Sequence, residues 1–122
     1  MRILYVEDVL PNSLLIERIA RMGDHTVINY ISAEEAIANF ERDNPDIMLV
    51  DIRLDGDMDG VEFIRYMRDR GCTTPMIAVT AYMDYREECL LAGADEFYVK
   101  PIPVRSLWRM LQRYDHSGEV GV

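Results

Sequence analysis

Short apolar runs alternate along the chain with longer segments in which apolar residues recur at helical spacing. The run 47–50 consists of apolar residues only, which is typical of a strand buried on both faces of a sheet. The run 26–30 is β-branched and aromatic but more polar, which favours an edge strand. The pattern predicts five strands, at residues 2–6, 26–30, 47–50, 76–79 and 97–99.

A helix is predicted between each strand and the next, and another after the last strand. Pro11 can begin the first helix, and Gly23 can end it. Leu15, Ile19 and Met22 fall on one face of this helix, so we expect them in the core.

Two further helices carry signals at their N-termini. Ser32, followed three residues later by Glu35, matches a capping box. Asp84 and Glu87 have the same spacing and match an N-cap and its partner. We therefore expect the second helix to begin after Ser32 and the fourth to begin after Asp84.

This alternation of strands and helices, joined by short loops, predicts one parallel sheet with helices on both faces. We expect a doubly wound α/β fold of flavodoxin-like type, with strand order 2-1-3-4-5. The first and third strands then lie side by side, and they end in Glu7, Asp8 and Asp51. Thr80 and Lys100 end the next two strands. All of these polar side chains would share the edge at which open parallel sheets bind ligands.

Composition narrows the class of protein. The 122 residues suffice for one domain with its own core, and we expect this domain at residues 1–114, followed by a flexible tail or linker at 115–122. A net charge of −9 argues against direct binding of nucleic acid. No apolar run approaches a membrane span, and acidic residues come too early for a signal peptide. Cys72 and Cys89 match no metal spacing, so we expect free thiols and a cytoplasmic location.

The polar residues at the predicted edge suit a magnesium-dependent phosphoryl transfer. Glu7, Asp8 and Asp51 are clustered carboxylates that need a cation, and all-oxygen ligands favour Mg²⁺. Lys100 is the single lysine among 13 basic residues, and with Thr80 it can contact the oxygens of a phosphoryl group. Asp51 can then act as the nucleophile and form an aspartyl phosphate.

These residues lie within five motifs that occur in a fixed order. The motifs are YVED at 5–8, LVDIRL at 49–54, MDG at 58–60, AVTA at 78–81 and GADEFYVKP at 93–101. Each motif is short, but together they fall at the expected strand ends. Over residues 2–114 the chain resembles the receiver domain of bacterial two-component response regulators, of the chemotaxis-regulator type.

The resemblance implies a role for each residue of the acidic group. Asp51 matches the phosphoacceptor, and Asp8 matches the main carboxylate ligand of magnesium. Glu7 matches the acid that usually reaches the metal through water. Arg53 matches the position whose backbone carbonyl binds the metal, so its side chain is not needed for that role.

The resemblance also implies a switch. Thr80 and Lys100 match the pair that contacts the phosphoryl group, and Phe97 matches the aromatic residue that changes rotamer when the threonine moves. Pro101 matches a proline that usually follows a cis peptide bond. Phosphorylation would then change the surface formed by the fourth helix, the last strand and the last helix.

The implied function is a step in a two-component phosphorelay, not the turnover of a metabolite. A histidine kinase or a histidine phosphotransfer protein would donate the phosphoryl group. Neither membrane nor nucleic acid is an expected partner. The output partner stays unknown, and phosphorylation-dependent homodimerisation stays open.

Two features depart from the usual pattern of such receivers. The loop 51–60 is one residue longer than the commonest spacing, and it is acidic. Arg53 and Tyr82 occupy variable positions that, in such receivers, tune how fast the phosphoryl group is lost. We expect the bulky Tyr82 to screen attacking water and prolong the life of the phosphate.

Three alternatives share parts of this pattern. A pseudo-receiver that is never phosphorylated would be expected to lack part of the set Asp8, Asp51, Thr80 and Lys100, which is complete here. A magnesium-dependent phosphatase of another α/β family would place its nucleophile on the first strand. A flavodoxin-type cofactor binder should carry a hydroxyl-rich loop there, where this chain has Glu7 and Asp8.

Overall fold

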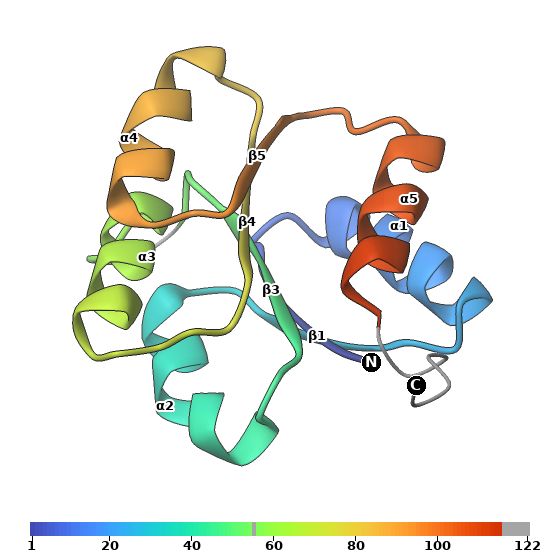
Figure 1. The fold of residues 1–122 in the computed structure, drawn as a ribbon, viewed down its shortest axis with the longest axis horizontal. Coiled ribbons are helices and arrows are strands. Elements are labelled where there is room, and N and C mark those ends of the chain that lie inside the picture. The colour runs from blue at the N-terminus through green and yellow to red at the C-terminus, as the bar shows by residue number, and fades with distance from the viewer. Residues whose placement is uncertain (55, 116–122) are drawn as a thin grey trace, which may run out of the picture.

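The computed structural model describes residues 1–54 and 56–115. Five parallel strands form one sheet in the order β2-β1-β3-β4-β5, as predicted (Figure 1). The strands are β1 (Arg2–Val6), β2 (Thr26–Tyr30), β3 (Ile47–Asp51), β4 (Met76–Thr80) and β5 (Glu96–Val99). The α-helices are α1 (Leu10–Met22), α2 (Ala33–Asp43), α3 (Gly60–Asp69), α4 (Arg86–Ala92) and α5 (Val104–Tyr114). The doubly wound α/β fold is therefore confirmed.

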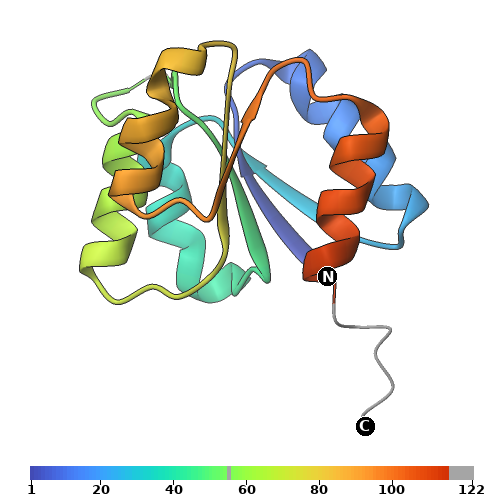
Figure 2. The same cartoon turned by 45° about the horizontal axis from the view of Figure 1, so that its top comes forward.

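The helices form a layer on each face of the sheet. Helices α1 and α5 cover one face, and α2, α3 and α4 cover the other (Figures 1 and 2). Strands β3 and β4 are buried at every position, whereas no residue of β2 is fully buried. The central and edge positions predicted from hydrophobicity are thus correct, because a central strand is covered by helices on both faces.

The predicted inner face of α1 is partly wrong. Ile19 is buried as expected, but Leu15 and Met22 are 45% and 71% exposed. Ile16 and Ala20 take their place against the sheet. Apolar residues occupy more than one face of this helix, so periodicity alone could not decide which face packs inward.

The capping predictions have different outcomes. Ser32 is the N-cap of α2, and its hydroxyl oxygen accepts a hydrogen bond from the Glu35 backbone N–H at 3.2 Å. The prediction for Asp84 is wrong, because this residue lies within a single 3₁₀ turn, η1 (Met83–Tyr85). Tyr85 precedes α4, and no side chain caps that helix. The tight turn uses Asp84 as part of the connection, so its side chain does not cap α4.

Other predictions concern the cysteines, membrane-spanning helices and the C-terminal tail. Cys72 and Cys89 are free thiols. None of the helices in the described part of the chain is long and apolar enough to cross a membrane. Of the predicted tail 115–122, all but Asp115 lies outside the described residues.

Candidate functional site

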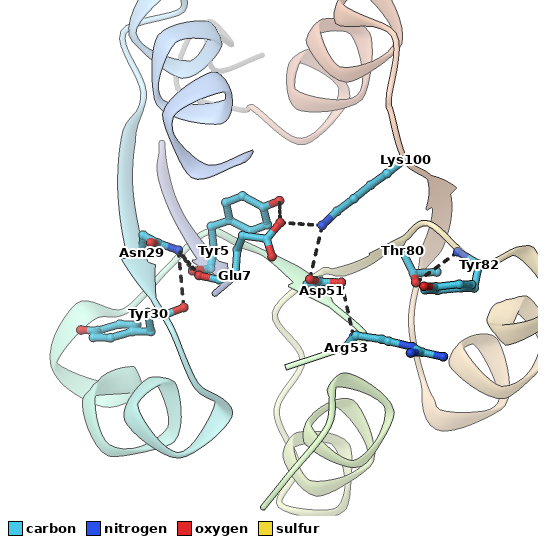
Figure 3. Close-up of polar contacts among 9 residues, drawn as sticks. All are labelled: Tyr5, Glu7, Asn29, Tyr30, Asp51, Arg53, Thr80, Tyr82 and Lys100. Carbon is cyan, nitrogen blue, oxygen red and sulfur yellow. Dashed lines mark hydrogen bonds and ion pairs between the residues drawn. The ribbon is translucent and has the colours of Figure 1, made fainter. Parts of the chain in front are cut away.

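The register of the sheet places the polar residues of the predicted edge next to one another. Val6 pairs with Val50, so the residues that follow them, Glu7 and Asp51, are neighbours at the carboxyl ends of β1 and β3. Thr80 pairs with Val99, which brings Lys100 just beyond the end of the adjacent strand. The four strands β1, β3, β4 and β5 thus supply one site (Figure 3).

Three carboxylates form the centre of this site. Glu7, Asp8 and Asp51 each offer one oxygen atom, and these atoms lie within 4.8 Å of one another. Glu7 and Asp51 are buried, with 1% and 5% of their surface exposed, whereas Asp8 is half-buried. Converging carboxylate oxygens that are open to solvent on one side fit a hard divalent cation such as Mg²⁺.

Lys100 pairs with two members of this acidic group. Its Nζ lies 2.5 Å from Glu7 Oε1 and 3.3 Å from Asp51 Oδ2. The Lys100 backbone N–H donates to the carbonyl oxygen of Thr80 at 2.8 Å, and the peptide bond from Lys100 to Pro101 is cis. The ammonium group is therefore already at the carboxylates and does not have to be recruited from solution.

Burial dominates the ionisation of the site. The pKa of Asp51 is raised to about 7, chiefly by desolvation and further by the hydrogen bond and the charge of Glu7, and Lys100 opposes this rise. The carboxylates of Glu7 and Asp51 share one lysine in a place that water scarcely reaches. Without a further cation, the site thus favours keeping a proton on this pair.

Tyr5 is part of the site, and sequence analysis missed it. Its hydroxyl donates a hydrogen bond to Glu7 Oε1 at 3.1 Å. Burial, followed by the charge of Glu7, raises the pKa of Tyr5 far above its ordinary value, so the hydroxyl keeps its proton. A signal was available, because residues two apart on a strand point to the same face, and Tyr5 and Glu7 are two apart.

Arg53 and Tyr82 lie beside Asp51 and Thr80 (Figure 3). The Arg53 backbone N–H donates to Asp51 Oδ1 at 3.4 Å, and the Arg53 guanidinium lies over the Tyr82 ring, 4.3 Å from its centroid. The Tyr82 backbone N–H donates to Oγ1 of Thr80 at 3.3 Å. The two loops that follow β3 and β4 are thereby joined across the edge of the site.

Phe97 lies outside this polar group. It is half-buried and packs against the core cluster between the sheet and α2, α3 and α4. Tyr98, the next residue on β5, packs into the core on the opposite face. The structure thus puts Phe97 on the α4 side of the sheet and Tyr98 on the α5 side.

Comparison with known proteins agrees with this architecture. Residues 3–112 match the family model described as the response regulator receiver domain. The chain is 34% identical over 110 residues to the two-component response regulator PhoP of Pseudomonas aeruginosa, which covers 88% of this chain and 48% of that protein. The chain therefore spans about half the length of this curated relative.

Two solved structures show the same fold. One is the receiver domain of the sensor histidine kinase PA1611 of Pseudomonas aeruginosa PAO1, with a magnesium ion coordinated in its active site cleft. It is 35% identical with a TM-score of 0.82, and the match covers 93% of this chain and 95% of that one. The other is the BeF3-activated N-terminal receiver domain of Klebsiella pneumoniae RstA, which is 26% identical with a TM-score of 0.86. This match covers 93% of this chain and 97% of that one. By family match, by sequence and by fold, the chain belongs to the response regulator receiver domain family.

Proposed function

We propose that this receiver domain accepts a phosphoryl group on Asp51 from a histidine kinase or a histidine phosphotransfer protein, and acts as a switch. One observation carries the proposal: the buried Asp51 carboxylate lies within a compact acidic group and 3.3 Å from a lysine ammonium. An acid that ends a central buried strand is otherwise costly to the fold. Its placement is explained by a reaction that needs a nucleophile there.

The acidic group would hold Mg²⁺. Glu7, Asp8 and Asp51 would contribute carboxylate oxygens and Arg53 its backbone carbonyl, with water completing the shell, as this ion prefers. Bound there, the ion would neutralise negative charge on an incoming phosphoryl group. The receiver domain of PA1611, which carries magnesium in its active site cleft, supports this assignment.

Transfer would place a new bond on an Asp51 carboxylate oxygen. That oxygen attacks phosphorus while the bond between phosphorus and the donor's imidazole nitrogen breaks, and the nitrogen keeps the electron pair. The Lys100 ammonium neutralises charge on the phosphoryl oxygens. Because Thr80 Oγ1 accepts a hydrogen bond from the Tyr82 backbone N–H, its own O–H is available to donate to the phosphoryl group.

The readout would be the surface formed by α4, β5 and α5. Movement of Thr80 toward the phosphoryl group would open space for Phe97, which lies on the α4 side of the sheet. Helix α4 has seven residues and no side-chain cap, and only Cys89 and Ala92 are buried in it, so few contacts oppose its displacement. A shift in population requires only that the phosphorylated site favours one arrangement.

The remaining assignments follow from this activity. We infer that the receiver domain comprises residues 1–114 and that it turns over no metabolite. The free thiols of Cys72 and Cys89 agree with a reducing compartment such as the cytoplasm. A pseudo-receiver gains no support, because Asp8, Asp51, Thr80 and Lys100 are all present at the same edge.

Phosphoryl incorporation from acetyl phosphate tests the proposal. The chain and an Asp51→Asn variant would be incubated with and without Mg²⁺. We expect magnesium-dependent label that is stable in acid and labile in base, and that is absent from Asp51→Asn. A folded chain that binds Mg²⁺ and takes up no label would overturn the proposal in favour of a pseudo-receiver.

A further inference from the structure

Two donors share one oxygen of Glu7. Lys100 Nζ lies 2.5 Å from Glu7 Oε1, and the Tyr5 hydroxyl donates to the same oxygen at 3.1 Å. Figure 3 shows Tyr5 and Lys100 approaching the Glu7 carboxylate together, next to Asp51. The side chain of Glu7 has no exposed surface. A buried carboxylate is sensitive to the loss of any donor, since water cannot replace it.

The two donors differ in their freedom to move. The Tyr5 ring is 2% exposed and packs with Ile16 and Leu107 between β1, α1 and α5, so its hydroxyl is fixed in place. Lys100 carries its ammonium on a flexible four-carbon stem that is 19% exposed. One donor is therefore held by the core, and the other can turn toward a new acceptor.

The proposed transfer requires such a turn. Lys100 Nζ lies closer to Glu7 Oε1 (2.5 Å) than to Asp51 Oδ2 (3.3 Å), so contact with phosphoryl oxygens on Asp51 would draw the ammonium away from Glu7. This shift weakens a buried ion pair, and weakening one partner of such a pair is costly. A second donor that stays on Glu7 Oε1 lowers that cost, because the oxygen keeps a hydrogen bond throughout.

We propose that Tyr5 is a positioning residue, whose fixed hydroxyl keeps a hydrogen bond on Glu7 Oε1 while Lys100 moves to the phosphoryl group. The inference rests on the proposed function of Asp51. Tyr5 is not among the proposed metal ligands and its hydroxyl bonds Glu7, so it would act through Glu7 and Lys100. Its hydroxyl matters after Lys100 has moved and matters less for binding of Mg²⁺ alone.

The test separates these two events in a Tyr5→Phe variant, which keeps the ring and removes the hydroxyl. Calorimetry measures the affinity for Mg²⁺ alone. Fluorine NMR measures binding of beryllofluoride, a phosphoryl analogue, at saturating Mg²⁺, and acetyl phosphate gives the rate of labelling. We expect beryllofluoride affinity and labelling rate to fall about tenfold, the effect of one hydrogen bond to a charged group. We expect the Mg²⁺ affinity to change less than about twofold, because the variant keeps every proposed metal ligand and Lys100 stays on Glu7 when no phosphoryl analogue is bound.

Tyr98→Phe is the matched control. Tyr98 also donates its hydroxyl to a glutamate two residues away in the sequence, Glu96, and the other recorded partner of this hydroxyl is Arg113, so it contacts no member of the acidic group. The same chemical change there should leave Mg²⁺ affinity, beryllofluoride affinity and labelling rate as in the unchanged chain. A loss equal to that of Tyr5→Phe would overturn the inference, because it would show a general effect of removing such a hydroxyl.

Other outcomes also decide the matter. Beryllofluoride binding that is unchanged in Tyr5→Phe overturns the inference, and so does an equal loss of Mg²⁺ and beryllofluoride affinity. If Tyr5→Phe does not fold, 4-aminophenylalanine at position 5 keeps a donor on a similar ring, and it should bind beryllofluoride like the unchanged chain. Weak binding by that folded variant overturns the inference. Absence of label on the unchanged chain would instead mark failure of the proposed function itself.

Discussion

A tyrosine, a glutamate two residues away in the sequence and a cation from a later part of the chain come together twice in this molecule. The first set, which we name the rim cluster, consists of Tyr5, Glu7 and Lys100. The phenol and the ammonium both reach one oxygen of Glu7, at 3.1 and 2.5 Å. The glutamate side chain is fully buried, and that of the lysine is 19% exposed.

The second set, the flank cluster, consists of Glu96, Tyr98, Arg113 and Tyr114 on β5 and α5. Tyr98 and Arg113 donate to Glu96 Oε1 at 2.9 and 2.7 Å, and Tyr114 donates to the other oxygen. Here the side chains of Arg113 and Glu96 are 58% and 24% exposed. The cluster fastens α5 to the edge strand.

The two clusters have opposite electrostatic outcomes. Burial tends to raise the pKa of Glu96, but hydrogen bonds from Tyr114, Tyr98 and Arg113 outweigh it and hold that pKa below its ordinary value. Next to the rim cluster, the pKa of Asp51 is raised. One carboxylate with three donors is a stabilising contact, whereas Glu7 of the rim cluster and the neighbouring Asp51 share the positive charge of one lysine, which is a destabilising arrangement. The rim cluster therefore favours binding of a further cation, and the flank cluster favours a fixed helix.

Removal of the cation from each cluster should give the largest contrast. In metal-free buffer, Lys100→Met leaves buried carboxylates without a counter-charge, and we expect the free energy of unfolding to fall by about 3 kcal/mol or more. Arg113→Met should cause a clearly smaller loss, because its ion pair is exposed to water. Urea denaturation of both variants in EDTA measures the difference. Equal losses would show that burial does not separate the two clusters.

The next prediction uses pH to test the cost of the Asp51 charge. The pKa of Asp51 is about 7 in the folded chain and lower in the unfolded chain. Protonated Asp51 therefore stabilises the folded chain below the unfolded pKa, and this stabilisation is lost as the pH rises through 7. Metal-free Asp51→Asn should therefore be more stable than the unchanged chain at alkaline pH, by about 2–3 kcal/mol. The gain should shrink as the pH is lowered toward the ordinary pKa of aspartate.

Magnesium supplies the control for this prediction. Urea denaturation at alkaline pH would be repeated with saturating Mg²⁺, which would stabilise the native state if it binds the acidic group as proposed. The unchanged chain should gain more than Asp51→Asn, which lacks one carboxylate of the acidic group. If Asp51→Asn is no more stable than the unchanged chain at alkaline pH in EDTA, the raised pKa of Asp51 is contradicted.

The flank cluster should show the reverse dependence on pH. Because the pKa of Glu96 is lowered in the folded state, ionised Glu96 stabilises the fold above the unfolded pKa. This stabilisation is lost as pH falls through the folded pKa. Glu96→Gln should thus be less stable than the unchanged chain near neutral pH. This loss should be smaller than the gain expected for Asp51→Asn at alkaline pH. In acid, the stabilities of Glu96→Gln and the unchanged chain should become equal. Thermal unfolding over a pH series measures this, and a difference that grows in acid would contradict it.

Much of the fold could be predicted because its strands are short runs of a distinct kind. The run at 47–50 has no polar residue, which is typical of a central strand in a parallel sheet. The inner face of α1 could not be predicted, since Leu15 and Ile16 are both apolar and only contact with the sheet selects Ile16. The start of α4 was missed because a 3₁₀ turn takes up Asp84.

The site shows the same limit. Parallel strands gather their carboxyl ends, so the meeting of Glu7, Asp51 and Lys100 could be predicted from position alone. The role of Tyr5 is only hinted at by its spacing of two residues from Glu7, because an aromatic ring in a strand fits the core equally well with or without a hydroxyl partner. Which oxygen of Glu7 the lysine contacts depends on rotamers, which hydrophobic patterning does not encode.

The smallest predicted effect concerns the access of water to Asp51 at the edge of the sheet. Arg53 stacks on Tyr82 at 4.3 Å, beside the Asp51 and Thr80 side chains. We expect Tyr82→Ala to admit water and to speed loss of the phosphoryl group about two- to fivefold, the range expected for one exposed cation–π contact. The measurement is the decay of label after removal of acetyl phosphate.

The matched control is a second stacked pair away from the site. Arg70 lies over the Tyr66 ring at 4.2 Å, at the end of α3. Tyr66→Ala removes the same kind of contact without opening the edge near Asp51, so the decay of label should keep its original rate. If both variants speed the decay alike, the effect comes from general loosening of the fold. If neither does, then the stacked pair at the rim does not screen the phosphoryl group, and the lifetime of the phosphate is set by the buried residues around Asp51.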